Sequence, residues 1–307
     1  MQAIQVNEYG GPEQLKVVEI PKPIAHRSQV LVRVHATSFN PVDLKRVSGK
    51  MREVFRITFP FIPGGDFSGV IDSVAENISG YQPGDEVYGN TESGTYAEFA
   101  AIEVNKVSPK PRNLSHVEAA SLGVVAQTAL QALDHAHLQA GQTILIHGAS
   151  GAVGSAAVQL AKVRGAKVIA SGSSASLERL RSYGADQVFD YKTTPFESVA
   201  SNLDVVLDTV GGDVQQRSYA VLKPGGYLIA IAQPPSPAEA QKHGVHALFF
   251  SIDSSIDTLQ QLTPLVESGQ LKPHVAKTYP LSSASQAWQD ITTSHIEGKV
   301  VFAVVPE

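Results

Sequence analysis

Three glycines at a regular spacing form the motif of this chain that most directly suggests chemistry. Gly148, Gly151 and Gly154 lie in the segment "ILIHGASGAVGSAAVQLAK", between a predicted strand at 143–147 and a predicted helix. Glycines at such a turn let backbone N–H groups approach a pyrophosphate, and the positive end of the helix dipole then faces the phosphate. A glycine-rich turn in some other fold is the alternative. The motif predicts a loop that binds a dinucleotide.

The end of the next predicted strand bears on the choice of dinucleotide. An acidic residue there, roughly 20 residues beyond the loop, would bind the ribose of NAD. Gly172 and Ser173 stand at that place in "AKVIASGSSAS". With no carboxylate to repel it, a 2′-phosphate could be held by the hydroxyls of Ser173 and Ser174. The alternative is that these serines cap the helix that begins near Ser176. The pattern favours NADPH over NADH.

The composition excludes several classes of protein. The 307 residues include no cysteine, which removes disulfides, thiol catalysis and cysteine-ligated zinc. A net charge of −5 argues against nucleic acid as the main partner, because phosphate neutralisation needs a basic face. The start "MQAIQVNEYG" lacks the features of a signal peptide, and no apolar run approaches the roughly 20 residues that span a bilayer. We expect a cytoplasmic enzyme without a nucleic-acid or membrane partner.

Two kinds of pattern show how the chain positions these residues. The N-terminal part has short strands broken by turn residues, which is typical of a compact β-rich domain. The middle part alternates the apolar runs "TILIH", "AKVIAS", "DQVFDY", "DVVLDTV" and "YLIAIA" with helix candidates at 153–163, 176–183 and 214–222. This alternation indicates a doubly wound sheet of buried parallel strands. The helical "DTLQQLTPLVESG" and the final strand "GKVVFAVV" are expected to return to the first domain.

Several longer motifs resemble one family. They are "HGASGAVGSAAVQLAKVRGAKVIAS", "YGADQVFDY", "LDVVLDTVGGD", "LKPGGYLIAI", "NPVDLKRVSG", "PFIPGGDFSGVI", "GYQPGDEVYG" and "GKVVFAVV". Together they are similar to the zinc-free quinone oxidoreductase branch of the medium-chain dehydrogenase/reductase superfamily. The resemblance implies an α/β protein with a GroES-like, β-rich catalytic domain over 1–120 and 257–307 and a Rossmann NADP-binding domain over 121–256. It also implies an active-site cleft where the domains meet and a homodimer formed through the cofactor domain.

The family comparison also bears on metal binding. Zinc-dependent members of the superfamily carry a cysteine and a histidine as metal ligands. Asn40 of "NPVD" stands here at the cysteine position, Gly65 of "PGGD" stands at the histidine position, and the four-cysteine structural lobe is missing. The histidines suggest no substitute site: His135 and His137 are too close to share a helical face, and His147 ends a strand. No metal is expected.

Without a Lewis acid, reduction of an already polarised acceptor is easier than oxidation of a simple alcohol. A quinone or an α,β-unsaturated carbonyl is such an acceptor. The nicotinamide would supply the hydride, and the protein would supply position, dryness and hydrogen bonds.

The segment "NPVDLK" matches the family segment beside the nicotinamide and contains three catalytic candidates. Asn40 could hold the ribose or the substrate oxygen, or could be a simple turn residue. Asp43 could take part in the chemistry, or make an ion pair or a turn bond. Lys45 could stabilise a developing enolate or phenolate, at a position where other members carry a tyrosine.

The resemblance also assigns residues to the cofactor. Thr128 of "AQTALQAL" matches the threonine at the nicotinamide carboxamide, or is an ordinary residue of a buried helix. Tyr191 resembles the tyrosine near the 2′-phosphate, or packs at a strand end. Ala175 and Ser176 stand where many members place a lysine or arginine. The expected cofactor contacts are Thr128, Gly148, Ser150, Gly151, Ala152, Val153, Gly154, Ser173, Ser174, Tyr191, Val210, Ala232, Phe250 and Ser251.

Two classes of function follow from these residues. The first is an NADPH-dependent, metal-free oxidoreductase that transfers hydride to a quinone or an α,β-unsaturated carbonyl, with an alkenal or an enoyl thioester as close variants. The second is a non-catalytic NADPH-binding protein with a structural or regulatory role, since a fold does not fix a function. The intact glycine loop, Asn40 and Thr128 favour the enzyme.

Overall fold

The computed structural model of the chain describes residues 1–76, 78–294 and 296–305. The chain forms two compact units, which we call unit 1 and unit 2. Unit 1 comprises Met1–Val124, Ser254–Glu267 and Pro273–Glu307, and unit 2 comprises Val125–Asp253 and Ser268–Lys272. Unit 1 is therefore assembled from both ends of the chain, and the middle of the chain supplies most of unit 2.

The main sheet of unit 1 has strand β3 (Gln29–Ser38) in its interior. The strand order is β14-β15-β3-β4-β5-β7, and β6 also pairs with β3. All pairs are antiparallel except β14 with β15. The other strands of this sheet are β4 (Asp66–Val74), β5 (Glu86–Asn90), β6 (Phe99–Glu103), β7 (Val107–Pro109), β14 (Val275–Pro280) and β15 (Lys299–Ala303). A separate pair consists of β1 (Gln2–Gln5) and β2 (Lys16–Glu19).

Local sequence signals fix the helices of unit 1. Pro41 occupies the first turn of α1, where its fixed φ suits the helix and no N–H is needed. Ser115 and Glu118 form a capping box at the start of α2. Trp288 of α9 is fully buried and anchors the helix in an aromatic core. The helices of this unit are α1 (Pro41–Val47), α2 (His116–Ala120), α8 (Ile256–Glu267) and α9 (Ala284–Thr293).

Unit 2 contains a six-stranded sheet in the order β10-β9-β8-β11-β12-β13, and every neighbouring pair is parallel. Counted along the chain this is the order 3-2-1-4-5-6 of a doubly wound dinucleotide-binding fold, so the predicted fold class is confirmed. The strands are β8 (Thr143–His147), β9 (Lys167–Gly172), β10 (Gln187–Asp190), β11 (Leu203–Asp208), β12 (Leu222–Ala230) and β13 (His246–Phe249).

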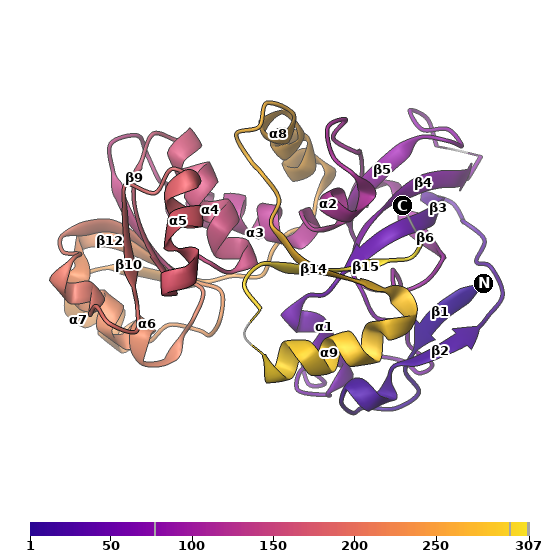
Figure 1. Cartoon of the computed structure of the whole chain (residues 1–307), viewed down its shortest axis with the longest axis horizontal. Coiled ribbons are helices and arrows are strands. Elements are labelled where there is room, and N and C mark those ends of the chain that lie inside the picture. The colour runs from indigo at the N-terminus through magenta and orange to yellow at the C-terminus, as the bar shows by residue number, and fades with distance from the viewer. Residues whose placement is uncertain (77, 295, 306–307) are drawn as a thin grey trace. The chain divides into compact units, whose positions relative to one another are not determined.

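The helices of unit 2 pack on this sheet. Helices α4 and α5 contact strands β8, β9 and β10, whereas α6 and α7 contact strands of the other half of the sheet (Figure 1). The helices are α3 (Gly123–His135), which spans the boundary of the two units, α4 (Ala152–Val163), α5 (Leu177–Ser182), α6 (Gly212–Ser218) and α7 (Pro237–His243). The predicted helices at 153–163 and 176–183 agree closely with α4 and α5, and α6 is shorter than its predicted span.

One strand of this sheet had no counterpart in the predicted pattern. Strand β13 has only four residues, and Leu248 and Phe249 in it are 37% and 40% exposed. A short edge strand with exposed apolar residues lacks the continuous buried run by which parallel strands are identified.

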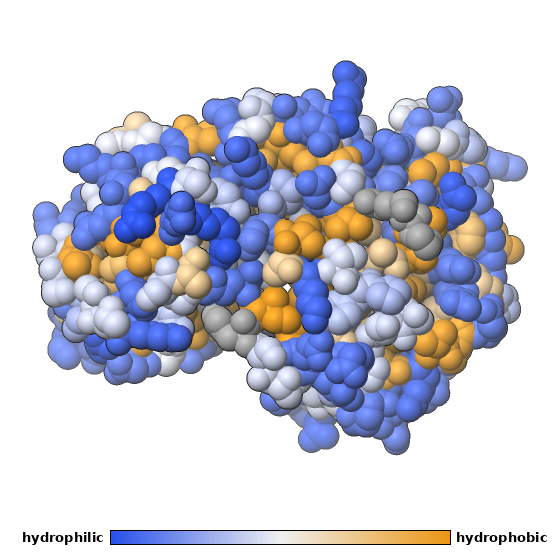
Figure 2. All heavy atoms as spheres, viewed as in Figure 1, coloured by the Kyte–Doolittle hydropathy of each residue, from blue (hydrophilic) through white to orange (hydrophobic). Residues whose placement is uncertain are grey.

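The surface of the protein is mixed in character. Hydrophilic side chains predominate on the face shown in Figure 2, with apolar patches between them. Within the described ranges, no helix combines the length and the hydropathy that crossing a membrane would require.

Candidate active site

The ends of four strands of unit 1 bring polar residues together on one side of the sheet. The antiparallel register places Ser38, the last residue of β3, opposite Asp66, the first residue of β4. Asp66 in turn pairs with Asn90 at the end of β5. Strand β15 runs antiparallel along β3 and begins at Lys299. Residues that are far apart in the sequence therefore meet on this side of the sheet.

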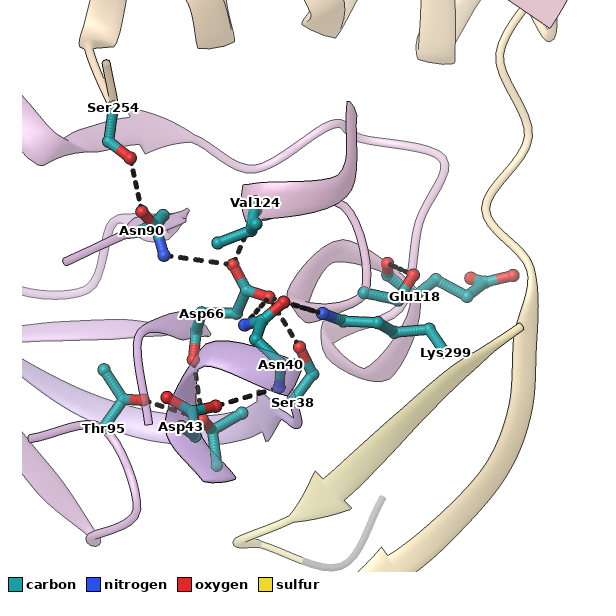
Figure 3. Close-up of polar contacts among 12 residues, drawn as sticks. Ser38, Asn40, Asp43, Asp66, Asn90, Thr95, Glu118, Val124, Ser254 and Lys299 are labelled. Carbon is teal, nitrogen blue, oxygen red and sulfur yellow. Dashed lines mark hydrogen bonds and ion pairs between the residues drawn. The ribbon is translucent and has the colours of Figure 1, made fainter. Parts of the chain in front are cut away.

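Asp66 is the centre of this polar cluster (Figure 3). Its side chain is completely buried. One carboxylate oxygen accepts hydrogen bonds from Ser38 Oγ at 2.8 Å, Asn40 Nδ2 at 2.9 Å and Lys299 Nζ at 2.9 Å. The other accepts from Val124 N at 2.7 Å and Asn90 Nδ2 at 3.3 Å. A buried charge requires such partners, so this set of donors explains how Asp66 is tolerated inside the unit.

Asn40 links the cluster to helix α1. It is 3% exposed and stands at the position before the helix. Its backbone N–H donates to Asp43 Oδ2 at 2.9 Å, and its side chain contacts Asp66 and Lys299. Asn40 is therefore more than a simple turn residue, since its carboxamide is held from two sides.

Asp43 is buried in the first turn of α1 and accepts the Asn40 N–H, so the turn bond considered as an alternative role is present. Burial raises the pKa of the Asp43 carboxyl to about 7, against the opposing effects of the Asn40 hydrogen bond and the Lys299 charge; the negative charge of Asp66 raises it further. This carboxyl can gain or lose a proton near neutral pH.

Lys45 behaves differently from the other two catalytic candidates. It is exposed on α1 and takes no part in the hydrogen bonds of the cluster. The structure thus brings Asn40 and Asp43 together and leaves Lys45 outside. Asp66 and Lys299 belong to the cluster but were not singled out from the sequence. The available signal was a charged residue at the very start of an apolar strand, in "GGDFSGVI" and "GKVVFAVV".

The glycine loop lies at the carboxyl end of β8 in unit 2. Gly148 has a φ of +64°, a conformation that favours glycine. A Cβ on Gly154 would lie 2.3 Å from Gly148 O and 2.6 Å from Ala149 Cα, so helix and strand pack too closely for a side chain. A Cβ on Gly151 would meet only Gly148 O, at 3.3 Å. The loop is therefore tight on its inner side and open at Gly151.

This geometry fits a dinucleotide phosphate. Gly151 is the N-cap residue of α4 and supplies no capping side chain. The N–H groups of the first helical turn, at Ala152, Val153 and Gly154, precede the first intrahelical bond, which Ser155 N makes to Gly151 O. Uncapped N–H groups at the positive end of a twelve-residue helix suit an anion.

The end of β9 differs from expectation in one respect. Gly172 and Ser173 are placed as predicted, and a Cβ on Gly172 would lie 2.4 Å from Ser176 Oγ. However, the Ser174 hydroxyl donates to the carboxylate of Asp190, which ends the neighbouring strand β10 opposite Gly172. The expectation that no carboxylate lies near these serines is corrected, because parallel pairing brings the end of the third strand beside the end of the second.

Two further residues lie around this end of the sheet. Tyr191, which directly follows β10, is 51% exposed, so its ring is not buried at the strand end as the packing alternative supposed. Arg179 of α5 extends back to the glycine loop, where its Nη2 lies 3.5 Å from Ser150 O. This cation was not predicted as part of the site.

The remaining expected cofactor contacts follow other strands of the same sheet. Val210 comes after β11, Ala232 after β12, and Phe250 and Ser251 after β13. Parallel pairing places these segments at the same carboxyl edge as the glycine loop, where open α/β sheets bind ligands. Thr128 lies on α3 instead and is 6% exposed.

Asp208 holds one segment of that edge in place. Its carboxylate accepts the N–H groups of Val210 and Gly211 at 2.9 and 2.8 Å and the side chain of Gln215 at 3.0 Å. It is completely buried at the end of β11. Asp208 therefore fixes the loop that contains Val210.

Among the described residues, no group of three or more histidine, cysteine, aspartate or glutamate side chains could hold a metal ion. His147 instead bonds Ser218 Oγ through Nε2 at 3.0 Å, and burial lowers its pKa to about 4. This histidine is a neutral residue of the interior.

The comparisons with known proteins agree with this architecture. Residues 26–112 match the family described as "Alcohol dehydrogenase GroES-like domain", and residues 183–302 match "Zinc-binding dehydrogenase". The 2-methylene-furan-3-one reductase of Solanum lycopersicum is 35% identical over 100% of this chain and 80% of its own length. The quinone oxidoreductase of Rattus norvegicus is 34% identical over 98% of this chain and 96% of its own length.

Solved structures show the same relationship. The quinone oxidoreductase of Coxiella burnetii superposes with a TM-score of 0.90 at 32% identity, covering 99% of both chains. The CurK enoyl reductase superposes with a TM-score of 0.86 at 28% identity over 98% of both. The fold and the glycine loop define an oxidoreductase that uses a nicotinamide cofactor. The chain belongs to the zinc-free quinone oxidoreductase branch of the medium-chain dehydrogenase/reductase superfamily.

Proposed function

We propose that this protein uses NADPH to reduce a quinone or an α,β-unsaturated carbonyl compound without a metal. The glycine loop supports the proposed cofactor, because the loop is open at Gly151 and the helix after it begins without a capping side chain. The names of the relatives support the acceptor half, since they include quinone oxidoreductases and an NADPH-dependent alkenal/one oxidoreductase from Arabidopsis thaliana that is 35% identical over this whole chain.

The residues of unit 2 would bind the cofactor. The backbone of residues 148–154 would hold the pyrophosphate, and Val210, Ala232, Phe250 and Ser251 would line the nicotinamide side, with Thr128 at its carboxamide. When bound, the nicotinamide supplies the hydride for reduction. The loop fixed by Asp208 would keep Val210 in place during this step.

The residues of unit 1 would act on the acceptor. The Asn40 carboxamide would donate a hydrogen bond to the acceptor oxygen, where negative charge develops on reduction. The pKa of Asp43 lies at about 7, so its carboxyl could hold or release a proton during the reduction. Lys45 is exposed and lies outside the cluster, so we expect the reduction not to depend on it.

The preference for NADPH is supported by Gly172 and Ser173, which leave the end of β9 without an acid. Arg179 adds a cation at the glycine loop. Asp190 opposes the preference because its carboxylate engages Ser174. We therefore expect NADPH to bind more tightly than NADH, by a margin that Asp190 limits.

The decisive experiment follows NADPH and NADH oxidation by purified protein against quinones, enals, enones and an enoyl thioester. Turnover that favours NADPH supports the proposal, and the best acceptor distinguishes quinone from alkene reduction. Asn40→Ala should lower kcat at least 30-fold, whereas the matched control Lys45→Ala should stay within about threefold. Chelation by EDTA should leave turnover unchanged. NADPH binding without turnover on any acceptor would instead favour a non-catalytic binding protein.

We also propose that the protein forms a homodimer through strand β13. This strand is at the edge of the unit 2 sheet and exposes Leu248 and Phe249. An edge with unpaired backbone groups and apolar side chains is a template for pairing with a second copy. Light scattering should give twice the 32.6 kDa mass of one chain, and Phe249→Lys should shift it to the monomer. The cytoplasmic location expected from the sequence is a prediction that cell fractionation would test.

A further inference from the structure

Lys299 is a buried cation in contact with the residue proposed to bind the acceptor. It is the first residue of β15 and is 4% exposed. Its ammonium group lies 2.9 Å from Asp66 Oδ2 and donates to Asn40 Oδ1 at 2.5 Å. Figure 3 shows this group at the meeting point of the two side chains.

These two neighbours determine which way the Asn40 carboxamide faces. An ammonium group can only donate hydrogen bonds, so it must face the oxygen of the amide; a carboxylate can only accept, so Asp66 must face the nitrogen. Rotating the amide by half a turn would bring two donors together on one side and two acceptors together on the other. The Lys299–Asp66 ion pair therefore locks the amide in one orientation.

Within the part of the chain that the structure describes, the locked amide keeps one side-chain N–H that no protein group accepts. Asn40 Nδ2 carries two N–H bonds, and Asp66 takes one of them. The hydrogen bond from Lys299 to Oδ1 also polarises the amide, and a polarised amide is a stronger donor through its nitrogen. The neutral Asn40 side chain can in this way transmit part of the stabilising effect of the buried Lys299 charge to the acceptor oxygen.

We propose that Lys299 is a positioning residue for the reduction, because it orients and polarises Asn40 without touching the acceptor. This inference rests on the proposed function of Asn40. The competing view is that Lys299 only holds β15 against the sheet. The two views differ in whether the effect of Lys299 depends on the presence of the Asn40 amide.

A double-mutant cycle separates them. We expect Lys299→Met to lower kcat at least 30-fold while the Kd for NADPH changes less than twofold. In the Asn40→Ala background the same substitution should change kcat less than threefold. Equal losses in both backgrounds, or a kcat retained within threefold in the single variant, would overturn the inference.

Ser38→Ala is the matched control, because it removes a hydrogen bond from the same oxygen of Asp66 and leaves the contacts of Asn40 in place. We expect its kcat to stay within about threefold of the wild type. A loss as large as that of Lys299→Met would mean that any disturbance of Asp66 suffices, which would contradict a specific role for Lys299. If Lys299→Met does not fold, Lys299→Leu, which also lacks a charge and a hydrogen-bond donor, enters the same cycle with the same expectations.

A measurement without turnover keeps this inference separate from the proposed function. The side-chain NH2 signals of Asn40 are identified in an NMR spectrum by their loss in Asn40→Ala. We expect their hydrogen exchange with water to become at least tenfold faster in Lys299→Met and to change less than twofold in Ser38→Ala. Unchanged exchange in Lys299→Met would refute the lock. Wild-type protein that reduces no acceptor, yet shows the expected exchange, would refute the proposed function alone.

Discussion

The cluster around Asp66 and the loop around Gly148 are constructed by opposite means. The cluster consists of charged and polar side chains from four strands and from the start of α1, and its contact between Asn40 and Lys299 joins residues 259 positions apart. The loop is formed by backbone groups within a few residues, and its shape depends on the absence of side chains at Gly148 and Gly154. The first is sensitive to lost charge, and the second to added volume.

The largest effect should come from breaking the charge balance of the cluster. In Asp66→Asn, the amide NH2 would face hydrogen-bond donors in either orientation, because donors surround both oxygens of Asp66. The buried ammonium of Lys299 would also lose its counter-charge. We expect unfolding free energy to fall by about 4 kcal/mol, as is usual when one partner of a buried ion pair is removed. Urea denaturation measures this, with Ser38→Ala as a control that should lose about 1 kcal/mol. Similar small losses in both variants would show that the charge is not essential to unit 1.

The loop should respond to volume instead. In Gly154→Ala the new methyl group would clash with the backbone of Gly148 and Ala149, so we expect a loss of about 3 kcal/mol in stability. Gly151→Ala should cost less than about 1 kcal/mol, because its methyl meets one atom at 3.3 Å and its φ of −72° suits alanine. Its Kd for NADPH should nevertheless rise at least tenfold. Equal destabilisation by both variants would contradict the tight and open sides assigned to the loop.

The two regions should also differ in their response to pH. The pKa of Asp43 is raised to about 7 in the folded unit 1, from an ordinary value of 3.8. Between these values the folded state holds a proton that the unfolded state releases, so stability falls as pH rises from about 4 to 7. Asp43→Asn removes this dependence. Relative to the wild type, the free energy of unfolding of Asp43→Asn should therefore increase between pH 5 and pH 8, by an amount on the order of 2 kcal/mol. Melting temperatures of both proteins across this pH range check the difference.

His147 in unit 2 should act with the opposite sign. Its pKa is lowered to about 4 in the folded state from 6.5, so the unfolded state binds the proton first and stability is lost as pH falls from 6.5 to 4. In His147→Gln, stability should fall less steeply between pH 6.5 and pH 4. Because His116 of unit 1 has a similarly lowered pKa, part of the loss of stability at acid pH should remain in the variant. Thermal melts between pH 4.5 and 7 measure both contributions, and an unchanged loss of stability at acid pH would show that His147 does not titrate on unfolding.

The smallest expected effect concerns the cofactor specificity of unit 2. In Asp190→Asn the negative charge beside Ser174 is removed while a hydrogen-bond acceptor remains. The Kd for NADPH should fall about threefold to tenfold, with little change for NADH, since only NADPH carries the 2′-phosphate. Fluorescence titration with both cofactors checks this, and an equal change for both would place Asp190 away from the phosphate.

Local patterns predicted unit 2 well. The five apolar runs, the glycine turn and the helix after it are determined within windows of about twenty residues. The five runs form strands β8 to β12 of the parallel sheet, and the helix is α4. Strand β13 was missed because four partly exposed residues produce no such pattern. The carboxylate of Asp190 was missed for another reason: its proximity to Ser174 depends on which strands are neighbours, and a sequence pattern does not give strand order.

The cluster of unit 1 was harder to predict. Asn40 and Asp43 were identified because they share one short motif, whereas Asp66 and Lys299 reach them only through sheet register. Lys45, four positions after Pro41, was grouped with them by its place in the motif and lies exposed on the helix. Closeness along the chain was therefore a good guide to the loop and a poor one to the cluster.

The division of unit 1 between the two ends of the chain has a consequence for synthesis on the ribosome. The residues Val125–Asp253 of unit 2 emerge before strand β15 exists, so most of that unit can begin to fold while unit 1 still lacks its last strands. Until Lys299 emerges, Asp66 has no counter-charge and the Asn40 amide has no lock. The elements proposed to bind the nucleotide are therefore synthesised before the cluster proposed to act on an acceptor is complete.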